Sequence, residues 1–232
     1  MKDDTCYVIY ARLASERVPG KMLRPFAGTT LTDIALDKIE RSDTIPKSDF
    51  YLCVHEPELI EAGKARGLNV FERSEASAHE DSHLATLMEW WDKLPYTYCV
   101  EINPCLPFLT VETIDKFVRA YRESEYDGMF GVVERKDYFW DSKGNLMTPW
   151  PKGEELLNTK AVGITYQAAH CLRAGRLDTI GAGQWVGSFQ KPNDPVLYII
   201  ENEREMLDVD NEWEFDICEA YWQYSQANGK VV

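Results

Sequence analysis

Basic side chains cluster in a short turn-rich segment, residues 11–25, directly after the apolar, β-favouring run 6–10. They are Arg12, Arg17, Lys21 and Arg24. The guanidinium fork of arginine fits phosphate oxygens, and lysine supplies a compact point charge. The small residues Ala14 and Gly20 let backbone N–H groups approach a ligand closely. The segment matches neither a Walker A sequence nor a G-x-G-x-x-G fingerprint, so its residues leave open a triphosphate site or a solvated loop.

Two carboxylates stand two residues apart near the other end of the chain. Asp208 and Asp210 lie in the stretch 206–215, and side chains at i and i+2 of an extended segment point the same way. Both carboxylates can therefore reach one Mg²⁺. The alternative is a strand end with solvated acids, followed by Glu212 and Glu214 at a helix N-terminus.

The overall charge makes the basic segment stand out. The chain of 232 residues has 39 Asp and Glu against 25 Lys and Arg, a formal net charge of -14. Such a surface repels a phosphate backbone and an anionic bilayer, so we expect neither nucleic acid nor membrane as a partner. An anionic ligand must then be met by a local cluster of cations.

Two further observations indicate a cytoplasmic protein. The N-terminal residues are polar and acidic rather than basic and then apolar, and no apolar run approaches the ~18 residues of a membrane span. The six cysteines are scattered and form no C-x-x-C pair. We therefore expect reduced thiols that pack as small hydrophobic groups.

Strand-like and helix-like stretches alternate through the first half of the chain. The expected strands are 6–10, 50–54, 69–71 and 98–102, and the expected helices are 31–39, 58–66, 83–94 and 111–122. This alternation predicts an α/β fold, a three-layer Rossmann-like nucleotide-binding domain with a mainly parallel sheet and helices on both faces. Ligands of such sheets lie beyond the carboxyl ends of the strands, where the basic segment begins.

A single domain, residues 1–232, is expected, with a small inserted β-arm over 129–160. The stretch 136–153 is rich in aromatic residues, Gly and Pro, and 141–146 is typical of a hairpin turn. Its aromatic residues predict a subunit contact or a wall of the substrate site.

The basic segment resembles a known family. Ala-Arg-x-x-Ser-x-Arg-Val-Pro-Gly-Lys-x-Leu, followed by Pro25-Phe26-Ala27-Gly28 and a helix, is similar to the opening of the cytidylyltransferases that make CMP-activated acidic sugars. These comprise CMP-N-acylneuraminate, CMP-nonulosonate and CMP-Kdo synthetases. Met22 stands where sialate-type enzymes have Asn.

Three other segments carry the resemblance through the chain. Residues 206–215 resemble the family's Ile-Asp-Ile-Asp-Thr-Pro-Glu-Asp segment, and 70–82 resemble its Arg-Pro-x-x-Leu-x-x-Asp-x-x-Ser stretch, which places Arg73 and Ser82 near the nucleotide. Residues 101–108 resemble its Leu-Gln-Pro-Thr-Ser-Pro-Leu, with Asn103 in place of Gln. Cys105 occupies the position of a metal-binding Asp in Kdo-type enzymes, so no ligand is assigned there.

The resemblance implies an enzyme that couples CTP to an acidic 2-keto sugar, sialic acid-like or Kdo-like, and releases pyrophosphate. The implied nucleotide-binding residues are Arg12, Ser15, Lys21, Arg73 and Ser82. Asp208 and Asp210 would hold Mg²⁺, and one of the two would also accept the proton of the attacking hydroxyl. The implied catalytic residues are Arg12, Lys21 and Asp210. Asn103 would face the sugar. The family also implies a homodimer formed through the inserted arm.

Two other functions fit part of the pattern. A metal-dependent glycosyltransferase could use Asp208-Val209-Asp210 on a sugar nucleotide, without releasing pyrophosphate from CTP. A catalytically degenerate protein could bind a nucleotide sugar and turn nothing over. The joint presence of Arg12, Lys21 and both aspartates favours an active cytidylyltransferase.

Overall fold

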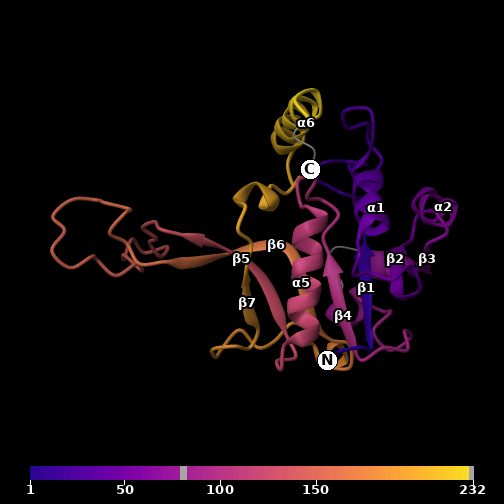
Figure 1. The fold of residues 1–232 in the computed structure, drawn as a ribbon, viewed down its shortest axis with the longest axis horizontal. Coiled ribbons are helices and arrows are strands. Elements are labelled where there is room, and N and C mark those ends of the chain that lie inside the picture. The colour runs from indigo at the N-terminus through magenta and orange to yellow at the C-terminus, as the bar shows by residue number, and fades with distance from the viewer. Residues whose placement is uncertain (79–82, 230–232) are drawn as a thin grey trace.

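A mixed sheet of seven strands forms the centre of the molecule (Figure 1). The structure, a computed structural model, describes residues 1–78 and 83–229. The strands follow the order β3-β2-β1-β4-β6-β5-β7 across the sheet. They are β1 (Thr5–Tyr10), β2 (Phe50–Val54), β3 (Asn69–Glu72), β4 (Tyr98–Ile102), β5 (Met129–Arg135), β6 (Thr165–Arg176) and β7 (Val196–Ile199).

Strand directions bring the carboxyl ends of β1 and β4 to the same edge. β1 pairs in parallel with both β2 and β4, and β5 pairs in parallel with β7. β6 is antiparallel to its neighbours β4 and β5. The expected α/β fold with a mainly parallel sheet is confirmed, and the loops that follow β1 and β4 necessarily meet at one place.

The described residues form four longer helices, and all but the second begin at a side-chain cap. They are α1 (Leu31–Arg41), α2 (Pro57–Ala65), α5 (Val111–Glu123) and α6 (Glu212–Ala227), with short helices α3 (Glu75–Ala78) and α4 (Leu84–Leu87) and 3₁₀ turns at Lys47–Asp49, Ile180–Ala182 and Glu203–Met206. The hydroxyl of Thr110 accepts a hydrogen bond from the N–H of Thr113 at the start of α5. Asn211 and Glu214 form a capping box on α6, so this helix begins directly after Asp210.

The two faces of the sheet are covered differently. Alternate strand residues such as Ile9 and Val100 pack with apolar residues of α1, α5 and α6 into the larger core. Cys6, Val8 and Cys99 face the other side, where the 84–96 and 177–189 segments cover them. The second face therefore carries short helices and turns, and the expected helix 83–94 is helical only at α4 before it gives way to turns.

The expected arm is displaced along the chain. Residues 129–135 are strand β5 of the central sheet, paired with β6 and β7, and the segment 136–164 between β5 and β6 projects far from the body (Figure 1). Its hairpin closes through the bridge between Trp140 and Leu146. Among the described helices, none combines the length and the apolar character that crossing a bilayer requires.

Candidate active site

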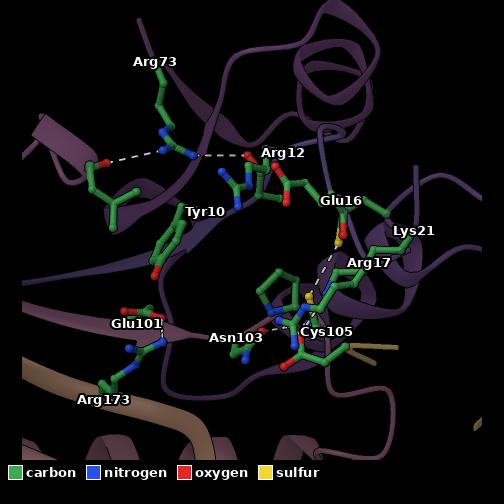
Figure 2. Close-up of a pocket in the computed structure, with 16 residues that line it drawn as sticks. Tyr10, Arg12, Glu16, Arg17, Lys21, Arg73, Glu101, Asn103, Cys105 and Arg173 are labelled. Atoms are coloured by element: carbon green, nitrogen blue, oxygen red, sulfur yellow. Dashed lines mark hydrogen bonds and ion pairs between the residues drawn. The ribbon is translucent and has the colours of Figure 1, made fainter. Parts of the chain in front are cut away.

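A cavity of about 280 Å³ lies at the carboxyl ends of β1 and β4 (Figure 2). The loop after β1 forms one wall, residues 101–105 of β4 and its following turn form another, and Arg73 and Arg173 close the remaining sides. The predicted residues Arg12, Ser15 and Lys21 all line it, as do Asn103 and Asp210. The parallel pairing of β1 and β4 brings the loop after β1 beside residues 101–105. A hydrogen bond of 3.0 Å from the N–H of Val209 to the carbonyl of Cys105 brings Asp210 there from the other end of the chain.

The loop after β1 is folded onto its own backbone. The carbonyl of Leu13 accepts hydrogen bonds from the N–H groups of Ser15 (2.8 Å) and Gly20 (3.2 Å). Gly20 has a positive φ of 65°, a conformation that glycine adopts without strain. The side chain of Val18 is fully buried and anchors the loop to the core. The basic side chains of this loop are thus presented along the cavity.

Two loop cations converge on one carboxylate. Nζ of Lys21 lies 3.3 Å from Oδ1 of Asp210 and donates to the carbonyl of Val209 at 2.6 Å. The guanidinium of Arg17 lies 3.1 Å from the same Oδ1. The Asp210 side chain is 39% exposed, so an incoming phosphate can compete for these cations.

The other two cations of the cluster have different surroundings. Arg12 lines the cavity and donates to the carbonyl of Ala78 at 3.1 Å. Arg24 turns away toward α6, where its guanidinium lies 2.6 Å from Glu212 and over the ring of Phe215. The cluster seen in the sequence therefore divides into three cavity residues and one residue that fastens the loop to α6.

The two aspartates differ in their environment. Oδ2 of Asp208 accepts a hydrogen bond from the amide of Asn103 at 3.2 Å, whereas its Oδ1 is buried without a hydrogen-bond partner among the described residues. Burial, and then the neighbouring Asp210, raise the pKa of Asp208 to about 6. Burial lowers the pKa of Lys21, but Cys105, Asp210 and Asp208 raise it, and the net shift is upward. The site therefore favours a further positive charge beside Asp208.

These donors fit a magnesium ion shared with a nucleotide. Asp208 offers an oxygen without a partner, and Asp210 offers a carboxylate that opens to the cavity. In the described part of the chain no three His, Cys, Asp or Glu side chains are grouped to hold a metal. Mg²⁺ commonly uses one or two carboxylates and completes its shell with substrate phosphates and water, so two aspartates suffice.

Arg73 lies at the cavity but is engaged by the backbone. It is 3% exposed, and its guanidinium donates to the carbonyls of Ala11 (3.3 Å) and Leu87 (3.4 Å) and to both oxygens of Ser77. This geometry holds the loop after β1 against the 73–87 segment. The other residue assigned to that stretch, Ser82, lies outside the described residues.

Cys105 stands where the resemblance implies a carboxylate in Kdo-type enzymes, and its thiol does not supply that charge. Burial, with a further contribution from Asp208, raises the pKa of its thiol to about 11, although Lys21 opposes the shift. Its sulfur lies 3.9 Å from that of Met22. At neutral pH this position holds a neutral thiol packed against a thioether, which is a poor ligand for magnesium.

A comparison with models of known protein families gives a match to this chain. A profile described as cytidylyltransferase matches residues 6–173, well over half of the chain and including the loop after β1 and the end of β4. The chain belongs to the cytidylyltransferase family. This finding favours cytidylyl transfer from CTP over the glycosyltransferase alternative. A search of curated proteins returned no match.

Solved structures share the fold of this cytidylyltransferase at low identity. The structure of CMP:2-keto-3-deoxy-manno-octonic acid synthetase complexed with CTP superposes with a TM-score of 0.66 at 13% identity, covering 96% of this chain and 100% of that one. A 4-diphosphocytidyl-2C-methyl-D-erythritol synthase from Anaerococcus prevotii gives 0.63 at 16%, covering 96% and 98%. A cytidylyltransferase from Leptospira borgpetersenii gives 0.58 at 14%, covering 95% and 87%.

The cytidylyltransferase cavity also contains residues that the sequence patterns did not reveal. Tyr10, Glu101 and Arg173 line it together, and Figure 2 shows them on the side away from Lys21. Glu101 sits inside the otherwise apolar strand β4, and a single acid in such a run is the signal that could have drawn attention to it. Arg173 carries no such signal, because only the pairing of β4 with β6 places it there.

A second cavity of about 580 Å³ adjoins the first in the cytidylyltransferase. Asp210 lines both, and Asp208 lines the second. Arg135, Arg204 and Trp213 also contribute to its wall. The paired aspartates thus stand at the boundary between the cation-lined first cavity and the second one.

Proposed function

We propose that this cytidylyltransferase transfers CMP from CTP to an acidic 2-keto sugar, sialic acid-like or Kdo-like, and releases pyrophosphate. The observation that carries the proposal is the position of Asp208 and Asp210 between the two cavities, beside Lys21. A nucleotide on one side and an acceptor on the other would then meet at these carboxylates. The fold shared with a CTP-bound synthetase of an acidic keto sugar supports this choice of acceptor.

Positioning and charge neutralisation supply most of the catalysis in this proposal. Arg12 and Lys21 hold the triphosphate and stabilise the charge that develops on the departing pyrophosphate. The anomeric hydroxyl of the sugar attacks the α-phosphorus in line from the side of the second cavity. Asp210 borders both cavities and accepts the hydroxyl proton as the new P–O bond forms.

Magnesium is the proposed cofactor, held by Asp208 and Asp210. When bound, it would neutralise triphosphate charge and polarise the phosphoryl group. Its positive charge would also offset the two effects that raise the pKa of Asp208, namely burial and the neighbouring Asp210. Asn103 holds the second oxygen of Asp208 at 3.2 Å, which orients the carboxylate for this purpose.

The second cavity supplies the proposed acceptor site. Arg135 and Arg204 offer cations for the sugar carboxylate, although each is already engaged, Arg135 by Glu203 and Arg204 by the hydroxyl of Tyr221. Asn103 lines the first cavity and reaches this one only through its hydrogen bond to Asp208. An acidic substrate would have to draw these arginines away from their present partners.

We further propose that the protein is a homodimer. The projecting segment 136–164 exposes large apolar side chains, namely Phe139, Trp140, Met147, Trp150, Leu156, Leu157 and Ile164. Solvated hairpins rarely expose so much apolar surface in one place, and burial against a second copy removes it from water. The resemblance to arm-bearing synthetases supports the same assignment.

The deciding experiment supplies wild-type protein with CTP, Mg²⁺ and individual acceptors, and measures pyrophosphate. The panel contains nonulosonic acids, Kdo and methylerythritol phosphate, the last because a diphosphocytidyl product requires an acceptor that brings its own phosphate. Release with an acidic keto sugar supports the proposal. Release only with the phosphorylated polyol would replace the acceptor, and CTP binding without release for any acceptor would favour the degenerate binding protein.

A further inference from the structure

A buried ion pair forms one side of the nucleotide cavity and has no part in the chemistry proposed above. Oε1 of Glu101 on β4 lies 2.7 Å from the guanidinium of Arg173 on β6, directly opposite in the antiparallel pairing. The Glu101 side chain is 3% exposed. Buried ion pairs are often no more stabilising than apolar residues of the same volume. Stability alone therefore gives little reason for two charges at this point.

One oxygen of this pair has no partner. The hydroxyl of Tyr10 lies beside both members of the pair. Oε2 of Glu101 is nevertheless buried and has no donor in hydrogen-bond geometry within the described part of the chain. A buried carboxylate oxygen without a donor is costly, and a ligand in the cavity can supply that donor. Arg173 also lines the cavity, and its guanidinium has N–H groups beyond those facing Glu101. An acceptor and a donor side by side match a hydroxyl group, which both donates and accepts.

The position of the Glu101–Arg173 ion pair in the cavity indicates which part of a bound CTP would contact it. A strand rises ~3.3 Å per residue, so Glu101 lies about 7 Å before Asn103, the residue that touches Asp208 at the reaction centre. Lys21, one of the two proposed cations of the triphosphate, lies on the other side of the cavity (Figure 2). The ribose is bonded directly to the α-phosphate, whereas the base is one ring farther away. The ribose is the first part of the nucleoside that meets this wall.

We propose that Glu101 and Arg173 recognise the ribose of CTP, with Oε2 of Glu101 accepting a hydrogen bond from a ribose hydroxyl and Arg173 donating to a ribose oxygen. The inference rests on CTP being the nucleotide substrate and is independent of the acceptor. The pair would make the enzyme selective for ribonucleotides over deoxyribonucleotides.

The test measures the affinity of the wild-type enzyme for CTP, 2′-deoxy-CTP and 3′-deoxy-CTP by calorimetry. At least one deoxy analogue should bind roughly 10-fold or more weakly, as expected for a lost hydrogen bond to a charged group. The double variant Glu101→Met/Arg173→Met removes both charges together and leaves neither unpaired. Its affinities for the three nucleotides should agree within about 2-fold.

A matched control removes a different buried carboxylate. Asp115 is 6% exposed on α5 and accepts hydrogen bonds from Ser42 and Thr44, so Asp115→Asn makes a comparable change far from the cavity. This variant should keep the wild-type preference for CTP, even where it lowers the melting temperature.

Several outcomes would overturn the inference. If the wild type binds CTP, 2′-deoxy-CTP and 3′-deoxy-CTP with equal affinity, the inference is wrong, whether or not the double variant folds. An unchanged preference in the double variant would make the pair a purely structural link between β4 and β6. A double variant that loses discrimination against UTP but keeps it against the deoxy analogues would assign the pair to the base. Absence of CTP binding by the wild type would instead contradict the nucleotide assignment itself.

Discussion

Nζ of Lys21 lies 3.3 Å from Oδ1 of Asp210, across 189 positions of the sequence. The lysine belongs to the loop after the first strand, and the aspartate precedes the last helix. The contact joins the proposed phosphate-binding loop to the proposed metal site. It is also one of the interactions that oppose the effect of burial on Lys21 and leave the pKa of this lysine raised, so Lys21 is charged before substrate arrives.

The loop cations provide the first prediction. Arg12→Ala and Lys21→Ala should each weaken CTP binding about 10-fold or more, because hydrogen bonds between charged groups contribute about 1.5–3 kcal/mol. Calorimetry measures the affinity, and circular dichroism checks that the fold is intact. Arg24→Ala is the matched control, since Arg24 belongs to the same loop but contacts Glu212. Wild-type affinity in both cavity variants would remove the nucleotide assignment.

A substitution at Asp210 should distinguish an effect on catalysis from an effect on CTP binding. Asp210→Asn keeps the size and one oxygen ligand but removes a charge, so pyrophosphate release should fall roughly 10²- to 10⁴-fold, as for loss of a general base. Metal-free CTP binding should be unchanged or slightly tighter, because a repulsive charge near the triphosphate is gone. Asp216→Asn, an exposed position on α6, serves as the control. Full turnover in Asp210→Asn would show that the proposed metal and base assignments are wrong.

Asp208→Asn should also lower turnover while leaving it measurable, but with a different effect on the metal. The variant keeps a side-chain oxygen beside Asn103 and loses the carboxylate that carries the unpartnered Oδ1. The Mg²⁺ concentration that gives half-maximal pyrophosphate release should rise about 10-fold or more, because losing a carboxylate ligand weakens metal binding. An unchanged magnesium dependence would assign the ion to other residues.

The burial of Lys38 leads to a prediction of how the free energy of unfolding depends on pH. Its Nζ is buried and donates to the carbonyls of Leu106 (2.9 Å) and Pro107 (2.8 Å), and burial lowers its pKa to about 7. Between pH 7 and 10.5 the unfolded chain holds this proton and the folded protein has released it. The free energy of unfolding therefore rises with pH across this window, by on the order of a few kcal/mol.

Urea unfolding at pH 7 to 10 measures this contribution. In Lys38→Met the rise should be smaller than in the wild type, because the titrating group is gone. Lys64→Met, at an exposed lysine on α2, should leave the slope as it is. If the free energy of unfolding rises equally with pH in the wild type and in Lys38→Met, Lys38 stays charged in the folded protein.

The exposed apolar side chains of the projecting segment 136–164 lead to a prediction of the oligomeric state. Light scattering at micromolar concentration should give the mass of a dimer for the wild type, and Trp140→Arg together with Leu156→Asp should shift it toward the monomer. Tyr224→Arg alters an exposed aromatic residue on α6 and should leave the mass unchanged. A wild-type monomer would contradict the dimer and favour the arm as a wall of the substrate site.

The sequence by itself predicted the residue types of the candidate site, because their chemistry is local. Phosphate binding needs cations in a tight loop, and magnesium binding needs carboxylates that point the same way, so both patterns are visible at short spacing. Strand–helix alternation likewise predicted the sheet, since apolar periodicity reports which face each segment buries. The inserted arm was visible from its composition, but its start was placed too early, because β5 and an exposed strand have the same local pattern.

Only the tertiary structure decided how these groups are used. Arg24 contacts Glu212 instead of the cavity, and Arg73 holds backbone carbonyls, because each meets partners that are distant in the sequence. The Glu101–Arg173 pair exists only where β6 runs antiparallel to β4. A side chain has the same chemistry wherever it stands, but its neighbours, and with them its burial and its charge, are set by strand order and packing.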